Sequence, residues 1–265
     1  MGSLFSNDQI ISWLDTLILP LFRVASLLMT APAFSTQTVP PRLRMAFALA
    51  VTALIVPTLP PTPPLDPFSV DAALGVFNQV LIGSAMGFTL RLIFAAVELG
   101  GQMVGQLMGL GFAALIDPQN GMSVPIVSQF YNLIVTLIYL SLDGHLMSLN
   151  ALAESFRGLP VGVIGPATVT WWDVTVWAGV ILRGGLLIAL PMVGVLTLVN
   201  ISFAVATRAA PAINIFSVGF PITLGVGVLI MIYNLPILSG QVDGLMRAAL
   251  DVVQGMAVAA PVGVK

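Results

Sequence analysis

Few side chains of this sequence could take part in a chemical reaction. Its 265 residues include a single histidine, His145, and no cysteine. Asp143 lies two positions before that histidine, but the sequence offers no nucleophile at a recognisable elbow. One histidine with scattered carboxylates is also too small a ligand set for a metal. We therefore expect no enzyme activity, no metal and no cofactor.

Two charged side chains, Arg91 and Glu98, lie in or at the end of one long apolar segment. Their spacing of seven residues corresponds to about two turns along one helix face, which is too far for a direct pair within the helix. Each is therefore expected to meet a residue of another helix or another subunit. We favour a structural ion pair for each of them. Ion coupling is the alternative, because ionisable groups inside membranes often mark ion pathways.

The segment 100–121 is rich in glycine and methionine. Gly101, Gly105 and Gly109 recur at every fourth position, so in a helix they form a bare stripe that another backbone can approach closely. Glycine costs a helix interior about 1 kcal/mol relative to alanine, so this density implies either close packing or a need to bend. Periodicity alone does not separate a helix contact from a deformable constriction.

Soft, bulky side chains accompany these glycines, namely Met103, Leu107, Met108 and Phe112. Thioethers fill irregular gaps and repack around different shapes, which suits a closure that seals and then admits something variable. A sequence typical of a turn follows at Asp117-Pro118. Irregular backbone at membrane depth requires burial in protein or access to water, so this tip points to an internal cavity.

The composition determines which elements must position these residues. Hydrophobic residues make up 58% of the chain and charged residues only 8%, with a mean hydropathy of +1.04. A soluble domain carries about 25% charged residues, so the chain belongs in a bilayer or a large apolar assembly. The net charge of -2 provides no basic face for nucleic acid. About six apolar runs are long enough to span a membrane: 9–31, 43–59, 73–99, 126–142, 174–206 and 212–238.

Runs of this length favour helices over barrel strands, which predicts an all-α membrane protein of kinked helical hairpins forming one domain, 1–265. The proline-rich connector 57–67 is expected to be an extended spacer, with recognition of a partner as the less favoured use. Asp66 followed by proline predicts the start of the third helix. The region 143–173 is interpreted as a long polar connection.

Two features of the later sequence bear on kinks and surfaces. The fifth run is too long for one straight span, and Gly184-Gly185 and Pro191 predict a kink or break in it. Residues 240–258 alternate polar and apolar positions as an amphipathic C-terminal helix does.

Arg23 interrupts the first run, where it either faces protein or water or extends to the membrane interface. Basic residues in the connections leave the orientation in the membrane open.

The sequence from Arg208 to Pro221 resembles the signature of the FliR/SctT family of type III secretion export-gate proteins. Other matches occur in the same order along almost the whole chain: Arg23, Ala31-Pro32-Ala33-Phe34, Val39-Pro40, Arg42, Gly111-Phe112-Ala113 and Asp117-Pro118. One departure is visible, because Ala212-Ile213 follow Pro211 where the family usually has Gln-Met. A polar contact made by that glutamine in relatives has no counterpart here.

The resemblance implies one subunit of a helical ring in the bacterial inner membrane, within the flagellar basal body. The implied partners are FliP-like and FliQ-like subunits in a hetero-oligomer, with FlhB-like and FlhA-like export components beside it. Unfolded flagellar subunits would pass through the ring as export substrates.

The resemblance also implies roles for individual residues. In the family, the loop that matches 109–118 plugs the closed pore. The predicted plug or gate residues are Met103, Met108, Gly109, Leu110, Gly111, Phe112, Ala113, Asp117 and Pro118. The residues predicted to pack subunits together are Gly101, Gly105, Arg91, Glu98, Arg208, Pro211, Asn214, Phe216, Gly219 and Pro221.

A secondary transporter of a small solute is the rival interpretation. It is motivated by the predicted break in the fifth run and by Arg91 and Glu98. Such a protein needs a self-sufficient helix bundle with a substrate site near the middle of the membrane. The sequence shows no convincing inverted repeat and few polar groups at the centres of its apolar runs. The export-gate interpretation is therefore preferred.

Overall fold

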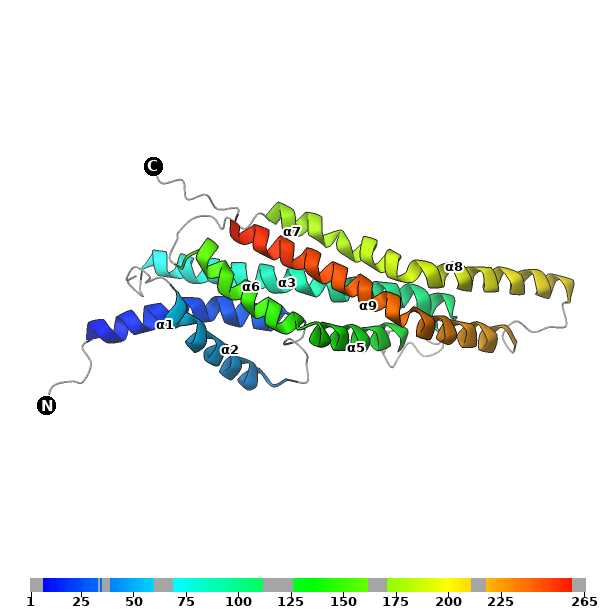
Figure 1. The fold of residues 1–265 in the computed structure, drawn as a ribbon, viewed down its shortest axis with the longest axis horizontal. Coiled ribbons are helices and arrows are strands. Elements are labelled where there is room, and N and C mark those ends of the chain that lie inside the picture. Colours follow the sequence, from blue (N-terminus) through cyan, green and yellow to red (C-terminus); the bar gives the residue numbers. More distant parts are fainter. Residues whose placement is uncertain are drawn as a thin grey trace. The chain divides into compact units, whose positions relative to one another are not determined.

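The computed structural model describes residues 7–32, 34, 39–59, 69–111, 126–161, 171–210 and 218–258. All regular structure in these ranges is helical, as predicted (Figure 1). The elements are α1 (Asn7–Thr30), α2 (Pro41–Ile55), the 3₁₀ turn η1 (Val56–Thr58), α3 (Val70–Leu107), α5 (Ile126–Ser141), α6 (Gly144–Gly158), α7 (Trp171–Ala178), α8 (Val180–Ala209) and α9 (Phe220–Val258).

Four helical segments among the described residues are long and apolar enough to cross a membrane. They are Pro41–Thr58, Val70–Leu107, Trp172–Ala209 and Phe220–Met256. The bent pair α5 and α6 can form a fifth span, whereas the apolar part of α1, Thr16–Thr30, is shorter. Each predicted apolar run is largely helical, and the prediction of an all-α membrane protein is confirmed.

The chain divides into two compact units, which we call unit 1 and unit 2. Unit 1 consists of residues 1–91, 143–178 and 247–265, and unit 2 of residues 92–142 and 179–246. The divisions along the chain fall inside α3, inside α9, between α5 and α6, and between α7 and α8. Each unit therefore has its own core.

In unit 1, α1 packs closely against the first half of α3. A Cβ atom at Gly83 would collide with the carbonyl oxygen of Arg23, and one at Gly87 would lie 2.9 Å from the carbonyl oxygen of Leu27. On α7, the indole Nε1–H of Trp177 donates to the carbonyl oxygen of Thr89 on α3 (3.1 Å). Glycines at helical spacing thus bring two backbones together.

In unit 2, the second half of α3 lies beside α5, α8 and α9 (Figure 1). A Cβ atom at Gly101 would lie 2.8 Å from Ser128 Cα on α5, and one at Gly185 would lie 2.9 Å from the carbonyl oxygen of Ala96. The buried core is Val97, Val104, Met108, Val127, Tyr131, Val135, Ile188, Ala189, Met192, Leu196, Leu238 and Val242. The packing is therefore close on two sides of α3.

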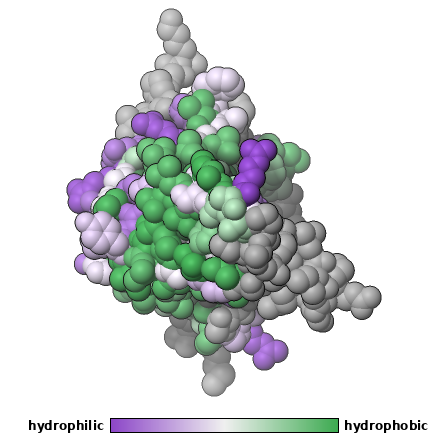
Figure 2. Space-filling view, turned by 90° about the vertical axis from the view of Figure 1, so that its right-hand side faces the viewer, coloured by the Kyte–Doolittle hydropathy of each residue, from purple (hydrophilic) through white to green (hydrophobic). Residues whose placement is uncertain are grey.

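The outer faces of α8 and α9 remain strongly apolar. Leu182, Leu198 and Val205 on α8 are each more than 60% exposed, and Leu229 on α9 is 68% exposed. Seen from the right-hand side of Figure 1, Figure 2 shows apolar side chains across much of the coloured surface, with hydrophilic ones mainly toward its edge. Such surfaces require lipid or other subunits as their surroundings.

The predicted start of the third helix at Asp66 lies outside the described residues, and the described helix α3 begins at Val70. Ser69 caps it, because its Oγ accepts a hydrogen bond from the amide of Ala72 (3.1 Å). A serine in this position satisfies one of the free N–H groups of the first turn, so Ser69 is the N-cap.

The interpretation of 143–173 as a long polar connection is wrong for its first half, where α6 occupies Gly144–Gly158. The polar side chains in this region lie on the same helix as a buried face that includes Ala151, Leu152 and Phe156, so their presence does not indicate a loop. The break before α6 falls at Asp143, whose φ of 55° lies in the left-handed region.

Of the predicted kink or break in the fifth run, a break at Gly184-Gly185 or Pro191 is not observed, and a kink stays a prediction. The helical interruption is at Gly179, between α7 and α8, and α8 continues through Gly184-Gly185 and Pro191. The paired glycines serve packing: Gly184 faces Ala96 and Gly185 faces Leu99, both on α3. Their small size, not their flexibility, explains their presence.

Two predicted boundaries also differ in the structure. Residues 240–258 do not form a separate helix, because α9 runs unbroken from Phe220 to Val258. In the proline-rich connector 57–67, Pro57 and Thr58 belong to η1 and are not extended. A 3₁₀ turn accepts proline near its start, where no N–H donor is needed. Residues 60–67 lie outside the described ranges.

Candidate functional site

The candidate site is the C-terminal end of α3, where the glycine and methionine segment begins to leave the helix. The amide of Gly109 donates to the carbonyl oxygen of Gln106 (3.0 Å), and that of Leu110 donates to the carbonyl oxygen of Gly105 (3.1 Å). Gly109 has a φ of +82°, a conformation that suits glycine. These features define a Schellman motif, which stops the helix and turns the chain.

Helix α8 supplies a donor to the same end. Asn200 Nδ2 donates to the carbonyl oxygen of Leu107, the last residue of α3 (3.2 Å). Thr223 Oγ1, on α9, lies 3.5 Å from Asn200 Oδ1. Three helices thus meet through polar groups in an otherwise apolar region.

Met108 and Gly109 pack against α9. Met108 is 2% exposed, and a Cβ atom at Gly227 would lie 2.7 Å from its Cγ and Cε atoms. A Cβ atom at Gly109 would lie 3.0 Å from Cδ2 of Phe220. The absence of a side chain at position 227 therefore creates the space that the Met108 thioether fills.

The remaining predicted gate residues spread from this end. Met103 and Leu110 are half-buried against the core of unit 2, and Gly111 is exposed. The other members lie outside the described residues: Phe112, Ala113, Asp117 and Pro118. The structure thus brings Met103, Met108, Gly109 and Leu110 to one end of α3.

The predicted subunit-packing residues of α3 have different surroundings. Gly101 packs inside the chain against Ser128 and Tyr131, and Gly105 is also buried. Arg91 is exposed and Glu98 is half-buried. Within the described ranges, neither of these two charged side chains makes a hydrogen bond or an ion pair, so their predicted partners in another subunit stay a prediction.

The signature segment is only partly described. Arg208 is exposed in the last turn of α8, and Gly219 is buried just before α9, whereas Pro221 is exposed in its first turn. The positions between them that were predicted to pack subunits lie outside the described residues: Pro211, Asn214 and Phe216.

A polar centre in unit 1 was not foreseen from the sequence. Arg23 is fully buried and donates to Gln79 Oε1 (2.7 Å), Ser155 Oγ (3.2 Å) and the carbonyl oxygen of Leu159 (2.8 Å). Its guanidinium carbon also lies 4.2 Å from the ring centroid of Phe156. Arg23 therefore faces protein, one of the two alternatives left open, and it joins α1, α3 and α6.

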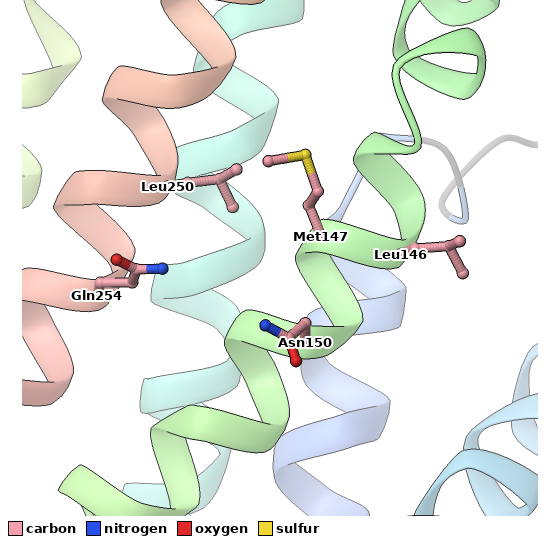
Figure 3. A pocket seen from close by; sticks show the side chains of 5 residues that line it. All are labelled: Leu146, Met147, Asn150, Leu250 and Gln254. Atoms are coloured by element: carbon pink, nitrogen blue, oxygen red, sulfur yellow. The ribbon is translucent and has the colours of Figure 1, made fainter.

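Unit 1 also has a shallow hollow between α6 and α9. It is lined by Leu146, Met147 and Asn150 of α6 and by Leu250 and Gln254 of α9 (Figure 3). Two amides and three apolar side chains offer no nucleophile or titratable group. In the part of the chain that the structure describes, no group of three potential metal ligands comes together either.

Comparison with known proteins agrees with this architecture. Residues 14–249 match the family described as bacterial export proteins, family 1. The chain is 34% identical over 234 residues to the flagellar biosynthetic protein FliR of Escherichia coli (strain K12), covering 88% of this chain and 89% of that protein. The FliR of Pectobacterium carotovorum subsp. carotovorum is 33% identical over 248 residues, which cover 93% and 94% of the two chains.

The apolar helices are those of a membrane protein. The chain belongs to the bacterial export proteins, family 1. It is a structural component of the flagellar type III export gate, located in the bacterial inner membrane within the flagellar basal body. It associates there with other flagellar export components.

Proposed function

We propose that the end of α3 and the segment following it plug the export pore in its closed state. The proposed plug comprises Met103, Met108, Gly109, Leu110, Gly111, Phe112, Ala113, Asp117 and Pro118. The observation that carries this proposal is the end of α3 at Gly109, where a Schellman motif turns the chain out of a tightly packed helix. A firm base followed by small and apolar residues suits a seal that deforms when a chain passes.

The partners proposed for this gate are FliP-like and FliQ-like subunits, which form the pore with this chain, and FlhB-like and FlhA-like components beside it. The exposed apolar faces of α8 and α9 support extensive contact with neighbouring helices. The cargo is unfolded flagellar subunits, and the chain acts without catalysis. A secondary transporter is not favoured, because family membership points to protein export.

The plug is tested by deleting residues 110–116 in cells that express the complete gate. We expect leakage of ions or small solutes to rise while the FliP-like and FliQ-like subunits still co-purify with the chain. A matched variant replaces 110–116 with the same number of glycine and serine residues, which separates loss of chain length from loss of apolar side chains. Background leakage from an assembled complex carrying the deletion contradicts the proposal.

A further inference from the structure

The end of α3 needs one hydrogen bond that its own backbone cannot supply. The Schellman motif uses the carbonyl oxygens of Gly105 and Gln106. Among the described residues, no backbone N–H group donates to the carbonyl oxygen of Leu107. Asn200 Nδ2 on α8 provides that donor at 3.2 Å. The Asn200 side chain on α8 thus supplies the hydrogen bond that the Leu107 carbonyl group at the end of α3 needs.

Helix α9 holds the same end from a second direction. Phe220, Thr223 and Gly227 follow one another at spacings of three and four residues, so they share one face of α9. The ring of Phe220 lies against Gly109, and Gly227 leaves space for the Met108 side chain. We call Asn200, Phe220, Thr223 and Gly227 the α3 clamp.

We propose that the α3 clamp fixes the position and direction in which the chain leaves α3, and that Asn200 is a positioning residue for the closed gate. This inference rests on the proposed plug and adds the residues that hold its base. The clamp holds Leu107, Met108 and Gly109, of which the last two belong to the proposed plug, and the plug continues at Leu110 and Gly111.

The geometry explains why a single side chain can matter. A helix that frays by one turn moves its end by about 5.4 Å along its axis, which displaces whatever follows it. Without Asn200, the part-buried carbonyl group of Leu107 lacks its protein donor, and an unpaired polar group of this kind is costly. Fraying is then favoured, because it lets the carbonyl group find water or another donor.

Within the clamp, Asn200 and Thr223 differ in the hydrogen bonds that they make. The single hydroxyl hydrogen of Thr223 has two acceptors in reach, the carbonyl oxygen of Gly219 at 2.9 Å and Asn200 Oδ1 at 3.5 Å. The shorter bond holds the start of α9. Of these two residues, Asn200 is the one with a hydrogen bond to α3, so its replacement is the more informative test.

The first test measures leakage in cells that carry Asn200→Leu, a substitution of similar size without a donor. We expect about a tenfold rise over the wild type at equal assembly with partner subunits, since one amide hydrogen bond of ~1.4 kcal/mol corresponds to tenfold in an equilibrium constant. The control is Thr197→Val on the same helix. Thr197 is exposed and its hydroxyl makes no hydrogen bond within the described ranges, so leakage stays at the wild-type value.

A second pair of variants tests the α9 side without changing polarity. Gly227→Ala places a methyl group against Met108, whereas a Cβ atom at Gly225 meets nothing within 4 Å. We expect leakage from the first variant and wild-type tightness from the second, although both add the same methyl group to the same helix. If Asn200→Leu fails to assemble, this pair still tests whether the α3 clamp is needed to keep the gate closed.

A third measurement follows the helix end directly. Because the chain has no cysteine, spin labels can be attached at Gln106→Cys and Ser202→Cys, both exposed positions of unit 2. In the assembled complex, the distance distribution between the labels should broaden in Asn200→Leu and stay narrow in Thr197→Val. A distribution unchanged by Asn200→Leu, with leakage equal to that of Thr197→Val, overturns the clamp.

The deletion of 110–116 separates failure of the clamp from failure of the plug. If the deletion leaks and both clamp variants are tight, the plug stands and the clamp is wrong. If the deletion is tight, the plug is wrong, and a broadened distance distribution would show only that Asn200 holds α3. Leakage in the deletion, Asn200→Leu and Gly227→Ala, with both controls tight, supports the whole inference.

Discussion

The cores of the two units differ in one respect, the presence of a buried charged side chain. Unit 1 is organised around a buried guanidinium, that of Arg23, which has neutral hydrogen-bond partners and an aromatic ring beside it. Both units have helices that approach closely at glycines, but in unit 2 methionine and tyrosine, not a charged group, fill the remaining space. Most buried polar side chains among the described residues belong to unit 1.

This difference determines which kind of contact resists displacement of the helices in each unit. A multidentate Arg contact has a fixed geometry, so it resists displacement until several hydrogen bonds break together. Close packing of small residues and thioethers depends less on direction, and methionine can repack when its surroundings shift. The Arg23 contacts therefore hold α1, α3 and α6 in one geometry, whereas unit 2 depends mainly on shape, with the Asn200 hydrogen bond as a directional contact at the end of α3.

Replacing Arg23 should have the largest effect. Arg23→Ala leaves Gln79, the Ser155 hydroxyl and the Leu159 carbonyl group without their donor and opens a cavity, so we expect a loss of about 3 kcal/mol or more. The amount of assembled complex and its melting temperature in detergent measure this loss. Arg23→Lys keeps the charge but not the planar fork, and should recover only part of the stability.

The control for this prediction is Arg42→Ala, because Arg42 is exposed on α2. Surface substitutions usually change stability by less than about 0.5 kcal/mol. Equal melting temperatures for Arg23→Ala and Arg42→Ala would remove the distinction between the two units.

Adding a methyl group at a packed glycine should have an intermediate effect in unit 2. Gly101→Ala forces its Cβ to 2.8 Å from Ser128 Cα, which requires α3 and α5 to separate, and overpacking of this kind costs about 1–3 kcal/mol. Gly194→Ala on α8 meets nothing within 4 Å and should gain up to about 1 kcal/mol from helix propensity. Opposite shifts in the melting temperature of the complex are the expected result; shifts of the same sign contradict it.

Removing a polar group from unit 2 should have the smallest effect. The Tyr131 hydroxyl donates to Met192 Sδ at 3.0 Å. Because sulfur is a weak acceptor, Tyr131→Phe should cost about 1 kcal/mol or less, since the ring still fills the same space. The melting temperature of the purified complex checks this. A loss as large as that of Arg23→Ala would mean that unit 2 also depends on a polar centre.

Several features of the fold and site followed from sequence patterns. The apolar runs predicted the helices, since apolar length and composition are local properties of the chain. The density of glycine between positions 101 and 109 drew attention to the end of α3. In contrast, the break near Gly184 was misplaced, because the sequence cannot show whether a glycine bends a helix or admits a neighbour. The helix α6 was not predicted, because its polar residues resemble those of a loop although its other face is buried.

The sequence by itself determined that the chain is a helical membrane protein, and its motifs indicated the export family, because composition and motif order do not depend on packing. Only the tertiary structure decided what Arg23 and Asn200 do. Their partners lie far along the chain, 56 and 136 residues from Arg23 at Gln79 and Leu159, and 93 residues from Asn200 at Leu107. No local pattern encodes such pairs, since a hydrogen bond between helices exists only once the helices have packed.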